Sequence, residues 1–325
     1  MDHDKTIGGE MRRQIRYERA ACALIDSLLQ YTSREGLVSF SIRPHGRFPV
    51  CGSVTALPSD SCGHADRHSL RGLTTSRTRM TTDYNAIAQQ YKKCKEHPWR
   101  SRIETYSLMN RIGSLEGKTV LDVACGEGFY TRKLRLSGAE EVVGIDLSEA
   151  MIRLARDQES REPLGITYRI EDACAESARQ EFDVVVSAWL LVYARNQVEL
   201  SAMCRGLARR VKSGGRFVTF TGNPNLHTFK DADYRKYGFS IRCTDHAYEG
   251  APIVWTVHLD DSSFEIENYH LPIEMYESAF LEAGFRDFAV HLPEVSPHPQ
   301  GMDDGPFWSE YLASPPAVLI DCVKC

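Results

Sequence analysis

An acidic turn rich in glycine follows an apolar stretch in VLDVACGEGFYTRKL, residues 120–134. The apolar run ends at Asp122, and Gly126 and Gly128 then allow a tight turn into a helix, where a larger side chain would keep a ligand away from the backbone. About 20 residues further on, Asp146 ends the next apolar run, where a carboxylate can accept hydrogen bonds from both hydroxyls of a ribose. The pattern indicates a site for a cofactor that contains a nucleoside.

Two kinds of cofactor are compatible with this spacing, a nicotinamide dinucleotide and S-adenosylmethionine (SAM). A dinucleotide site has a third small residue after the turn, but Thr131 stands at that position. The carboxylates of Asp122 and Glu127 would repel a pyrophosphate, whereas SAM carries a cationic sulfonium and an ammonium group. The charge of the turn therefore favours SAM.

Short apolar strands alternate with amphipathic helices from about residue 84 to the end of the chain. We expect helices over 84–94, 100–112, 130–136, 148–156, 197–211 and 272–283, and strands over 119–123, 141–145, 166–170, 183–187, 216–221, 288–292 and 317–323. This alternation predicts an α/β fold, a Rossmann-like sheet of seven mostly parallel strands with helices on both faces.

An insertion, residues 222–271, separates the fifth expected strand from the last long helix. Residues 253–259 and 264–269 alternate apolar and polar side chains around Asp260-Asp261-Ser262, which predicts an antiparallel hairpin. The insertion leaves the sheet near the carboxyl ends of its strands, where open α/β folds bind ligands. We therefore expect it to be a lid over the substrate.

Residues 1–79 differ in texture from the rest of the chain. One helix is expected over 12–31, and a mixture of Ser, Arg, Gly, Pro and His without sustained periodicity follows it. Such a segment buries too little apolar surface to offset its ordering entropy. We expect a poorly ordered N-terminal extension over 1–79 and one domain over 80–325.

Composition is ordinary for a soluble globular protein. The 325 residues are 42% hydrophobic and carry a formal net charge of −5, which gives no general attraction to nucleic acid or to an anionic membrane. No apolar run is long enough to span a bilayer and the N-terminus does not have the order of a secretory signal, so we expect a cytoplasmic protein. The ten cysteines form no zinc-ligand set, so no metal is expected; the oligomeric state stays open.

The successive motifs DVACGEG, GIDLS, EDA and FDVVVSA resemble those of class I SAM-dependent methyltransferases. The resemblance covers residues 80–323 in the order of elements and is specific over 117–221. The earlier segment YNAIAQQY is similar to the helix that precedes the core in methyltransferases of the ubiquinone-biosynthesis type. More loosely, the block 80–323 is similar to toxoflavin-type azapteridine methyltransferases.

This resemblance implies SAM as cofactor and a role for each matching residue. It implies that the backbone of residues 124–126 faces the methionyl part of SAM, that Asp146 binds the ribose, and that Asp172 meets the adenine amino group. The full set of cofactor-binding residues that it implies is Tyr84, Tyr91, Ala124, Gly126, Gly128, Asp146, Leu147, Met151, Asp172, Ala173, Ser187, Trp189 and Tyr193.

The implied reaction is methyl transfer by in-line displacement to a nitrogen or oxygen of a small molecule, an aromatic or azapteridine-like metabolite among the options. A hydroxyl acceptor needs a general base, and His270 and Tyr269, just before the last long helix, are the residues that we expect to act in catalysis. A basic stripe with interleaved aromatic residues is missing, which speaks against a nucleic-acid substrate. The alternatives are a non-catalytic regulator that binds SAM or another ligand and, third, an NAD-dependent oxidoreductase.

Overall fold

The computed structural model describes residues 82–175, 180–229, 231–298 and 300–325. The chain divides into two units, Met1–Gly72 and Leu73–Cys325, and the described residues all belong to the second. The helix expected over 12–31 and the extension expected over 1–79 therefore lie outside the described residues.

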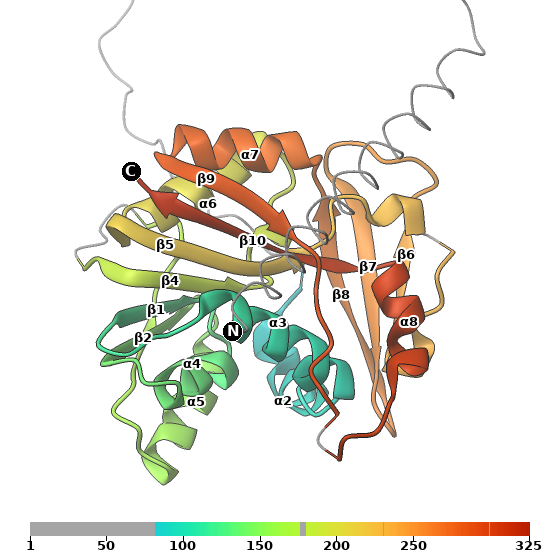
Figure 1. The fold of residues 1–325 in the computed structure, drawn as a ribbon, viewed down its shortest axis with the longest axis horizontal. Coiled ribbons are helices and arrows are strands. Elements are labelled where there is room, and N and C mark those ends of the chain that lie inside the picture. Colours follow the sequence, from blue (N-terminus) through green and yellow to red (C-terminus); the bar gives the residue numbers. More distant parts are fainter. Residues whose placement is uncertain (1–81, 176–179, 230, 299) are drawn as a thin grey trace, which may run out of the picture. The chain divides into compact units, whose positions relative to one another are not determined.

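A seven-stranded sheet forms the centre of the second unit, in the order β3-β2-β1-β4-β5-β10-β9 (Figure 1). Its strands are β1 (Thr119–Val123), β2 (Glu141–Asp146), β3 (Thr167–Ile170), β4 (Phe182–Ala188), β5 (Val211–Gly222), β9 (Phe285–His291) and β10 (Ala317–Lys324). The first five strands pair in parallel, and β10 runs antiparallel to both β5 and β9. The predicted Rossmann-like, mostly parallel sheet of seven strands is confirmed.

Helices lie on both faces of this sheet, as predicted. The described helices are α2 (Tyr84–Cys94), a π-helical turn (Arg100–Thr105) that runs into α3 (Tyr106–Ile112), α4 (Phe129–Leu136), α5 (Glu149–Arg161), α6 (Gln197–Ala208), α7 (Ile273–Glu282) and α8 (Gly305–Ala313). The strand order reverses between β1 and β4, so right-handed crossovers place α4 and α5 on one face and α6 on the other. In Figure 1, α7 lies beside α6, against which it packs.

A second, antiparallel sheet is built from the insertion, with β6 (Phe239–Cys243), β7 (Ala251–His258) and β8 (Ser263–His270) in that order. Its β7–β8 pair is the predicted hairpin, and every second residue of β7 is buried. The strand β6 was not predicted, because its five residues FSIRC are too few for periodicity to separate them from a loop. The helix α8 was not predicted either.

Several boundaries differ from the expected ones. The helix expected to continue to Val211 ends at Ala208, and β5 begins at Val211. Gly214 and Gly215 lie inside β5, next to a register shift in its pairing with β4, rather than marking the turn before the strand. Glycine in a strand often marks such an irregularity. The strand expected at 288–292 is β9, which begins at Phe285.

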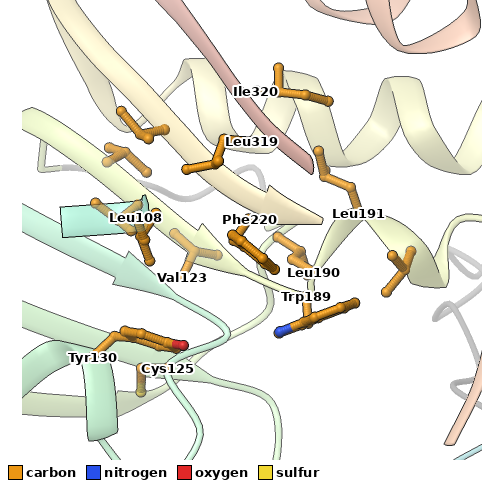
Figure 2. Packing of buried hydrophobic residues seen from close by; sticks show 14 of the residues in the cluster. Leu108, Val123, Cys125, Tyr130, Trp189, Leu190, Leu191, Phe220, Leu319 and Ile320 are labelled. Carbon is orange, nitrogen blue, oxygen red and sulfur yellow. The ribbon is translucent and has the colours of Figure 1, made fainter. Parts of the chain in front are cut away.

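The apolar core extends from the middle of the sheet to the carboxyl ends of its strands. Figure 2 shows side chains that follow one another from Leu319 and Ile320 on β10, past Phe220 on β5, to Trp189 just after β4. Phe220 is fully buried, and its ring centroid lies 5.6 Å from that of Trp189. The backbone of Trp189 is held as well, since its N–H donates to the carbonyl of Phe220 at 2.8 Å. The core thus fixes the position of an aromatic side chain at the strand tips.

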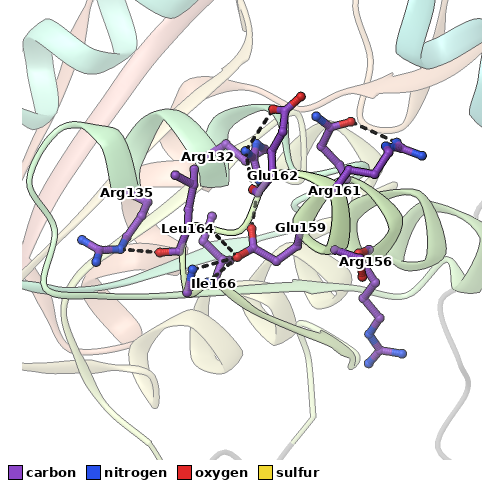
Figure 3. A network of polar contacts seen from close by, with 11 residues as sticks. Arg132, Arg135, Arg156, Glu159, Arg161, Glu162, Leu164 and Ile166 are labelled. Atoms are coloured by element: carbon purple, nitrogen blue, oxygen red, sulfur yellow. Dashed lines mark hydrogen bonds and ion pairs between the residues drawn. The ribbon is translucent and has the colours of Figure 1, made fainter.

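A polar network holds the segment between α5 and β3 (Figure 3). One carboxylate oxygen of Glu159 accepts hydrogen bonds from the backbone N–H groups of Leu164, Gly165 and Ile166 at 2.6, 2.7 and 3.1 Å. The other oxygen pairs with Arg132 of α4 at 2.9 Å. Because one side chain satisfies three backbone donors, we infer that it fixes the loop that leads into β3.

Replacing this residue tests the network. We expect Glu159→Ala to lower the free energy of unfolding by about 2 kcal/mol, because three backbone donors lose a charged acceptor. Glu162→Ala is the matched control: Glu162 is exposed, pairs with the same Arg132 at 3.4 Å, and should change that free energy by less than about 0.5 kcal/mol. Urea unfolding of both variants measures the difference, and equal effects would contradict the assignment.

Candidate active site

The turn after β1 brings backbone and carboxylate groups to the carboxyl end of the sheet. Ala124 and Gly126 have left-handed backbone angles, with φ of 59° and 56°. The buried Asp122 lies beneath the turn and accepts a hydrogen bond from the hydroxyl of Thr131 at 2.6 Å. Thr131, which stands where a dinucleotide site has a small residue, thus anchors α4 to the end of β1.

Asp146 ends β2 beside this turn, and the backbone holds both of its carboxylate oxygens. Its Oδ2 accepts from the N–H of Gly126, and its Oδ1 accepts from the N–H of Ser148, each at 2.8 Å. Burial raises the pKa of Asp146 to about 6, although these two donors oppose the shift. Each oxygen keeps a lone pair with which it can accept a hydroxyl group of a ligand.

A cavity opens beside these two strand ends, and we name it the cofactor cavity. It is lined by most of the residues that the sequence analysis singled out: Tyr84, Tyr91, Ala124, Gly126, Asp146, Leu147, Met151, Asp172, Ala173, Trp189 and Tyr193. These residues come from α2, from the ends of the strands β1 to β4, and from the segments that follow those strands. The topology therefore brings together residues that are more than 100 positions apart in the sequence.

Two of the expected cofactor residues, Gly128 and Ser187, are not among the lining residues. Gly128 has a φ of 86°, and a Cβ there would collide with the ring of Tyr168, so glycine is needed at that position for packing. Ser187 is fully buried in β4 and donates to the hydroxyl of Thr219 on β5 at 3.1 Å. The neighbouring Ala188 lines the cavity.

The N-terminal helix α2 covers one side of the cavity. The hydroxyl groups of Tyr84 and Tyr193 are hydrogen bonded to each other, and the rings of Tyr84 and Tyr91 meet edge to face with centroids 5.3 Å apart. Asn85 accepts from the hydroxyl of Ser148 at 2.9 Å and from the N–H of Ala150 at 3.0 Å. The helix is therefore attached both to the start of α5 and to the segment after β4.

Glu127 also lines the cofactor cavity. Its charge favoured SAM in the prediction from the sequence, but no contact with the cofactor was predicted for it. Its side chain is buried, and neither of its carboxylate oxygens has a hydrogen-bond partner. A buried carboxylate without a partner is costly, so such a group points to a cationic ligand. Its position between the glycines of GEG was the signal in the sequence. Lys95 also lines the cavity, but its ammonium lies over aromatic rings, 4.8 Å from the centroid of Tyr91.

The two residues expected to act in catalysis lie elsewhere. His270 and Tyr269 line a smaller cavity between β8 and the segment after β5, and neither of them lines the cofactor cavity. The ring of His270 stacks edge to face on that of His227 at 4.6 Å. Burial lowers the pKa of His270, and the neighbouring His227 adds to this shift. The structure therefore does not bring these two residues together with the cofactor-binding set.

Comparison with known proteins agrees with this geometry. Residues 120–215 match the family model described as a methyltransferase domain. N-demethylindolmycin N-methyltransferase of Streptomyces griseus is 28% identical over 189 residues, which cover 56% of this chain and 77% of that protein. Ubiquinone biosynthesis O-methyltransferase of Pseudomonas putida is 36% identical over 146 residues, 40% of this chain and 61%, less than two thirds, of that protein.

Among solved structures, the PH0226 protein of Pyrococcus horikoshii OT3 shares the fold, with a TM-score of 0.53 at 21% identity over 75% of this chain and 99% of that one. The matched domain, these relatives and the cavity at the strand ends support a class I SAM-dependent methyltransferase. SAM is its cofactor, and the prediction of an enzyme with this cofactor is confirmed. In the part of the chain that the structure describes, no helix is long and apolar enough to cross a membrane.

The buried Asp122 gives a test of the site's electrostatics. Burial raises its pKa to about 7, above the value of about 4 in an unfolded chain. Because the folded pKa is the higher one, ionisation disfavours the folded state, and this loss of stability grows as the pH rises from about 4 to about 7. In the cofactor-free protein, Asp122→Asn should therefore raise the free energy of unfolding by about 2 kcal/mol at pH 8 and have little effect near pH 4.

Asp183 is the matched control, because Lys212 and Thr119 lower its pKa to about 2. Its ionised form favours the folded state, so Asp183→Asn should lower stability at pH 8, the opposite direction. Chemical unfolding of both variants at several pH values measures the two effects. A destabilised Asp122→Asn variant at pH 8 would contradict the inferred burial of that charge.

Proposed function

We propose that the enzyme transfers the methyl group of SAM to a nitrogen or oxygen of a small aromatic molecule, with nitrogen favoured. The observation that carries this proposal is the cofactor cavity itself, whose acidic strand-end side adjoins a wall of aromatic side chains. The named activities of the two relatives, N-methylation and O-methylation of small molecules, support the same class of acceptor. We also propose that residues 80–325 form the methyltransferase domain, with the insertion 222–271 as its substrate cover.

We propose one orientation of the cofactor in the cavity, in which charges and polar groups are matched. In our proposal, Asp146 accepts both ribose hydroxyls, Leu147 and Met151 pack on the adenine, and Asp172 with Ala173 meets the adenine amino group. The methionyl part then lies along the backbone of the Ala124–Gly126 turn. There the unpartnered carboxylate of Glu127 would bind the ammonium group, which replaces an unpaired buried charge by an ion pair.

With the cofactor in this orientation, the methyl group would point towards Trp189 and Tyr193. The acceptor's lone pair forms a bond to the methyl carbon while the carbon–sulfur bond breaks. The electron pair of the broken bond stays on the sulfur, which becomes the uncharged thioether of S-adenosylhomocysteine (SAH). The protein's contribution is to hold the two reacting atoms in line and to exclude water. The hydrogen-bonded pair Tyr84–Tyr193 and the helix α2 would serve that exclusion.

The choice of nitrogen over oxygen rests on the bases within reach. No histidine is among the described residues that line the cofactor cavity. Burial raises the pKa of Tyr193 to about 12 and that of Tyr84 well above its usual value, so both phenols stay protonated. A hydroxyl acceptor would need a general base, whereas a neutral amine or ring nitrogen attacks without prior deprotonation.

Glu127 gives the sharpest test of the cofactor's orientation. We expect Glu127→Gln to weaken SAH binding by about 10- to 100-fold, because an ammonium group loses its buried carboxylate. It should leave the affinity for 5′-methylthioadenosine, which lacks the amino-acid part, unchanged. Isothermal titration calorimetry measures both ligands.

The control for that variant is Glu171→Gln. Glu171 lines the same cavity, but its carboxylate is already paired with Arg210 at 2.7 Å. This variant should change SAH affinity by less than about threefold. Equal losses in the two variants, or an equal loss for methylthioadenosine, would contradict the proposed position of the ammonium group.

The function itself is tested by incubating the full chain with SAM labelled in the methyl group and a panel of aromatic amines, ring-nitrogen heterocycles and phenols. We expect labelled product from nitrogen compounds, and none from the Asp146→Asn variant. Cofactor binding without any product over the panel and a small-molecule extract would favour a non-catalytic regulator. His270→Gln separates the two acceptor classes: kcat should change less than about threefold, whereas loss of a general base lowers it about 100-fold or more.

A further inference from the structure

A second, smaller cavity adjoins the cofactor cavity, and we name it the tryptophan cavity. Tyr84, Tyr91, Trp189 and Tyr193 line both cavities, so the two share a wall. The rest of its lining comes from the residues before α3 and from the inner face of the second sheet, with Trp99 and Trp255 as the largest side chains. The insertion thus contributes one side of this space.

Aromatic faces dominate the tryptophan cavity. The ring centroids of Trp189 and Trp255 are 5.1 Å apart and those of Trp99 and Trp189 are 6.4 Å apart, both pairs edge to face. Val257 and Ile266 add apolar surface. Perpendicular indole rings around an opening favour a flat ring system, which can stack on one of them and meet the edge of another.

The lining of the tryptophan cavity includes buried hydrogen-bond donors that have no partner. Trp99, Arg100 and Trp189 are each more than nine-tenths buried, and the indole Nε1–H of both tryptophans and the Nε–H of Arg100 have no hydrogen-bond partner. Trp99 and Arg100 line the tryptophan cavity and not the cofactor cavity, whereas Trp189 lines both. A buried donor without a partner is disfavoured by its lost hydration, so a ligand with lone pairs would supply what the wall lacks.

The charge of Arg100 is already balanced. Its Nη1 pairs with the fully buried Glu104 at 2.5 Å, and the hydroxyl of Tyr130 donates to the same carboxylate. A carboxylate or phosphate on the ligand would therefore bring an uncompensated negative charge into the cavity. Arg100 begins a π-helical turn, a geometry that occurs frequently at functional sites.

We propose that the tryptophan cavity is the methyl acceptor's binding site, and that it selects an uncharged, flat heteroaromatic ring that accepts hydrogen bonds from Trp99 and Arg100. This inference rests on the proposed function and narrows its substrate class. Trp189, on the wall shared by both cavities, lies where the methyl group would cross. In Figure 2 its nitrogen is turned towards the side on which Tyr130 and Cys125 of the cofactor cavity lie.

The test uses two probes of the same shape, quinoxaline, which has two ring nitrogens, and naphthalene, which has none. The chain contains four tryptophans, and three of them line the tryptophan cavity, so a bound ring should quench intrinsic fluorescence. With the full chain saturated with SAH, we expect quinoxaline to bind about tenfold more tightly than naphthalene, because only quinoxaline satisfies the donors. Equal affinities, or no quenching by either probe, would overturn the proposal.

Two matched variants locate the effect. Trp99→Phe removes an unpartnered donor, and should reduce the preference for quinoxaline by about fivefold. Trp255→Phe removes the same number of ring atoms from the same cavity, but its nitrogen is not among the buried atoms without a partner, so the preference should stay as in the parent. A preference that is unchanged in Trp99→Phe, with a melting temperature equal to that of Trp255→Phe, would overturn the role of that donor.

SAH affinity, measured by calorimetry on the same samples, separates the two levels of the proposal. If SAH does not bind, the proposed function fails. If SAH binds and labelled nitrogen products form while the two probes bind equally, only the assignment of the tryptophan cavity fails. Retained SAH affinity in Trp99→Phe is expected, because Trp99 does not line the cofactor cavity.

Discussion

The site depends on one half-buried carboxylate that two backbone segments share. Asp146 accepts from Gly126 in the turn after β1 and from Ser148 at the start of α5. A carboxylate so placed fixes the separation of two adjacent strand ends and also presents its remaining lone pairs to the cavity. Burial makes its ionisation unfavourable, and only the two donors and a ligand with hydroxyl groups offset that. This group therefore destabilises the cofactor-free protein at the position where we propose that the cofactor binds.

The same principle extends to the residues that surround Asp146. Asp122 and Glu127 are buried close to it, and each raises the pKa of neighbouring groups by repulsion. Asp122 is itself desolvated, and the carboxylate of Glu127 has no hydrogen-bond partner. A turn with this much buried negative charge would exclude a pyrophosphate, so the electrostatics that destabilise the cofactor-free site also determine which cofactor it accepts. The attachment of α2 through Asn85 to Ser148 links closure of the site to the same strand end.

Most of the fold could be predicted from the sequence, because the strands of a parallel sheet are continuous apolar runs and the helices between them are amphipathic. The lining residues near β1 and β2 followed from the spacing of Gly126 and Asp146. The strand β6 and the residues Trp99 and Arg100 could not be found in this way. The strand β6 is recognised by its pairing with β7, and Trp99 and Arg100 by their contacts with Trp189, more than 80 positions away in the chain. Periodicity within a segment carries no information on such contacts.

The expectation for His270 shows the same limit from the other side. Its position between the insertion and the last helix predicted that it lies near the strand tips. Sequence position does not determine, however, which of the cavities there the side chain lines. In the structure it stacks on His227 and lies in the smaller cavity, away from the cofactor-binding set.

The two cavities that do adjoin are opposite in polarity. The cofactor cavity has a carboxylate without a partner, and the tryptophan cavity has N–H donors without partners. During methyl transfer the positive charge of the sulfonium passes to the acceptor. N–H donors that point at this charge would disfavour the transfer, unless they donate hydrogen bonds to other lone pairs of the acceptor. A heteroaromatic ring with a second nitrogen or a carbonyl group meets this condition, because one lone pair can attack the methyl group while another accepts from the wall. The aromatic faces of Trp189 and Trp255 then stabilise the developing cation through their negative π surfaces. Donors and aromatic faces thus act on different parts of one ring, and this division explains why an enzyme that transfers a cationic group would have an uncharged acceptor site.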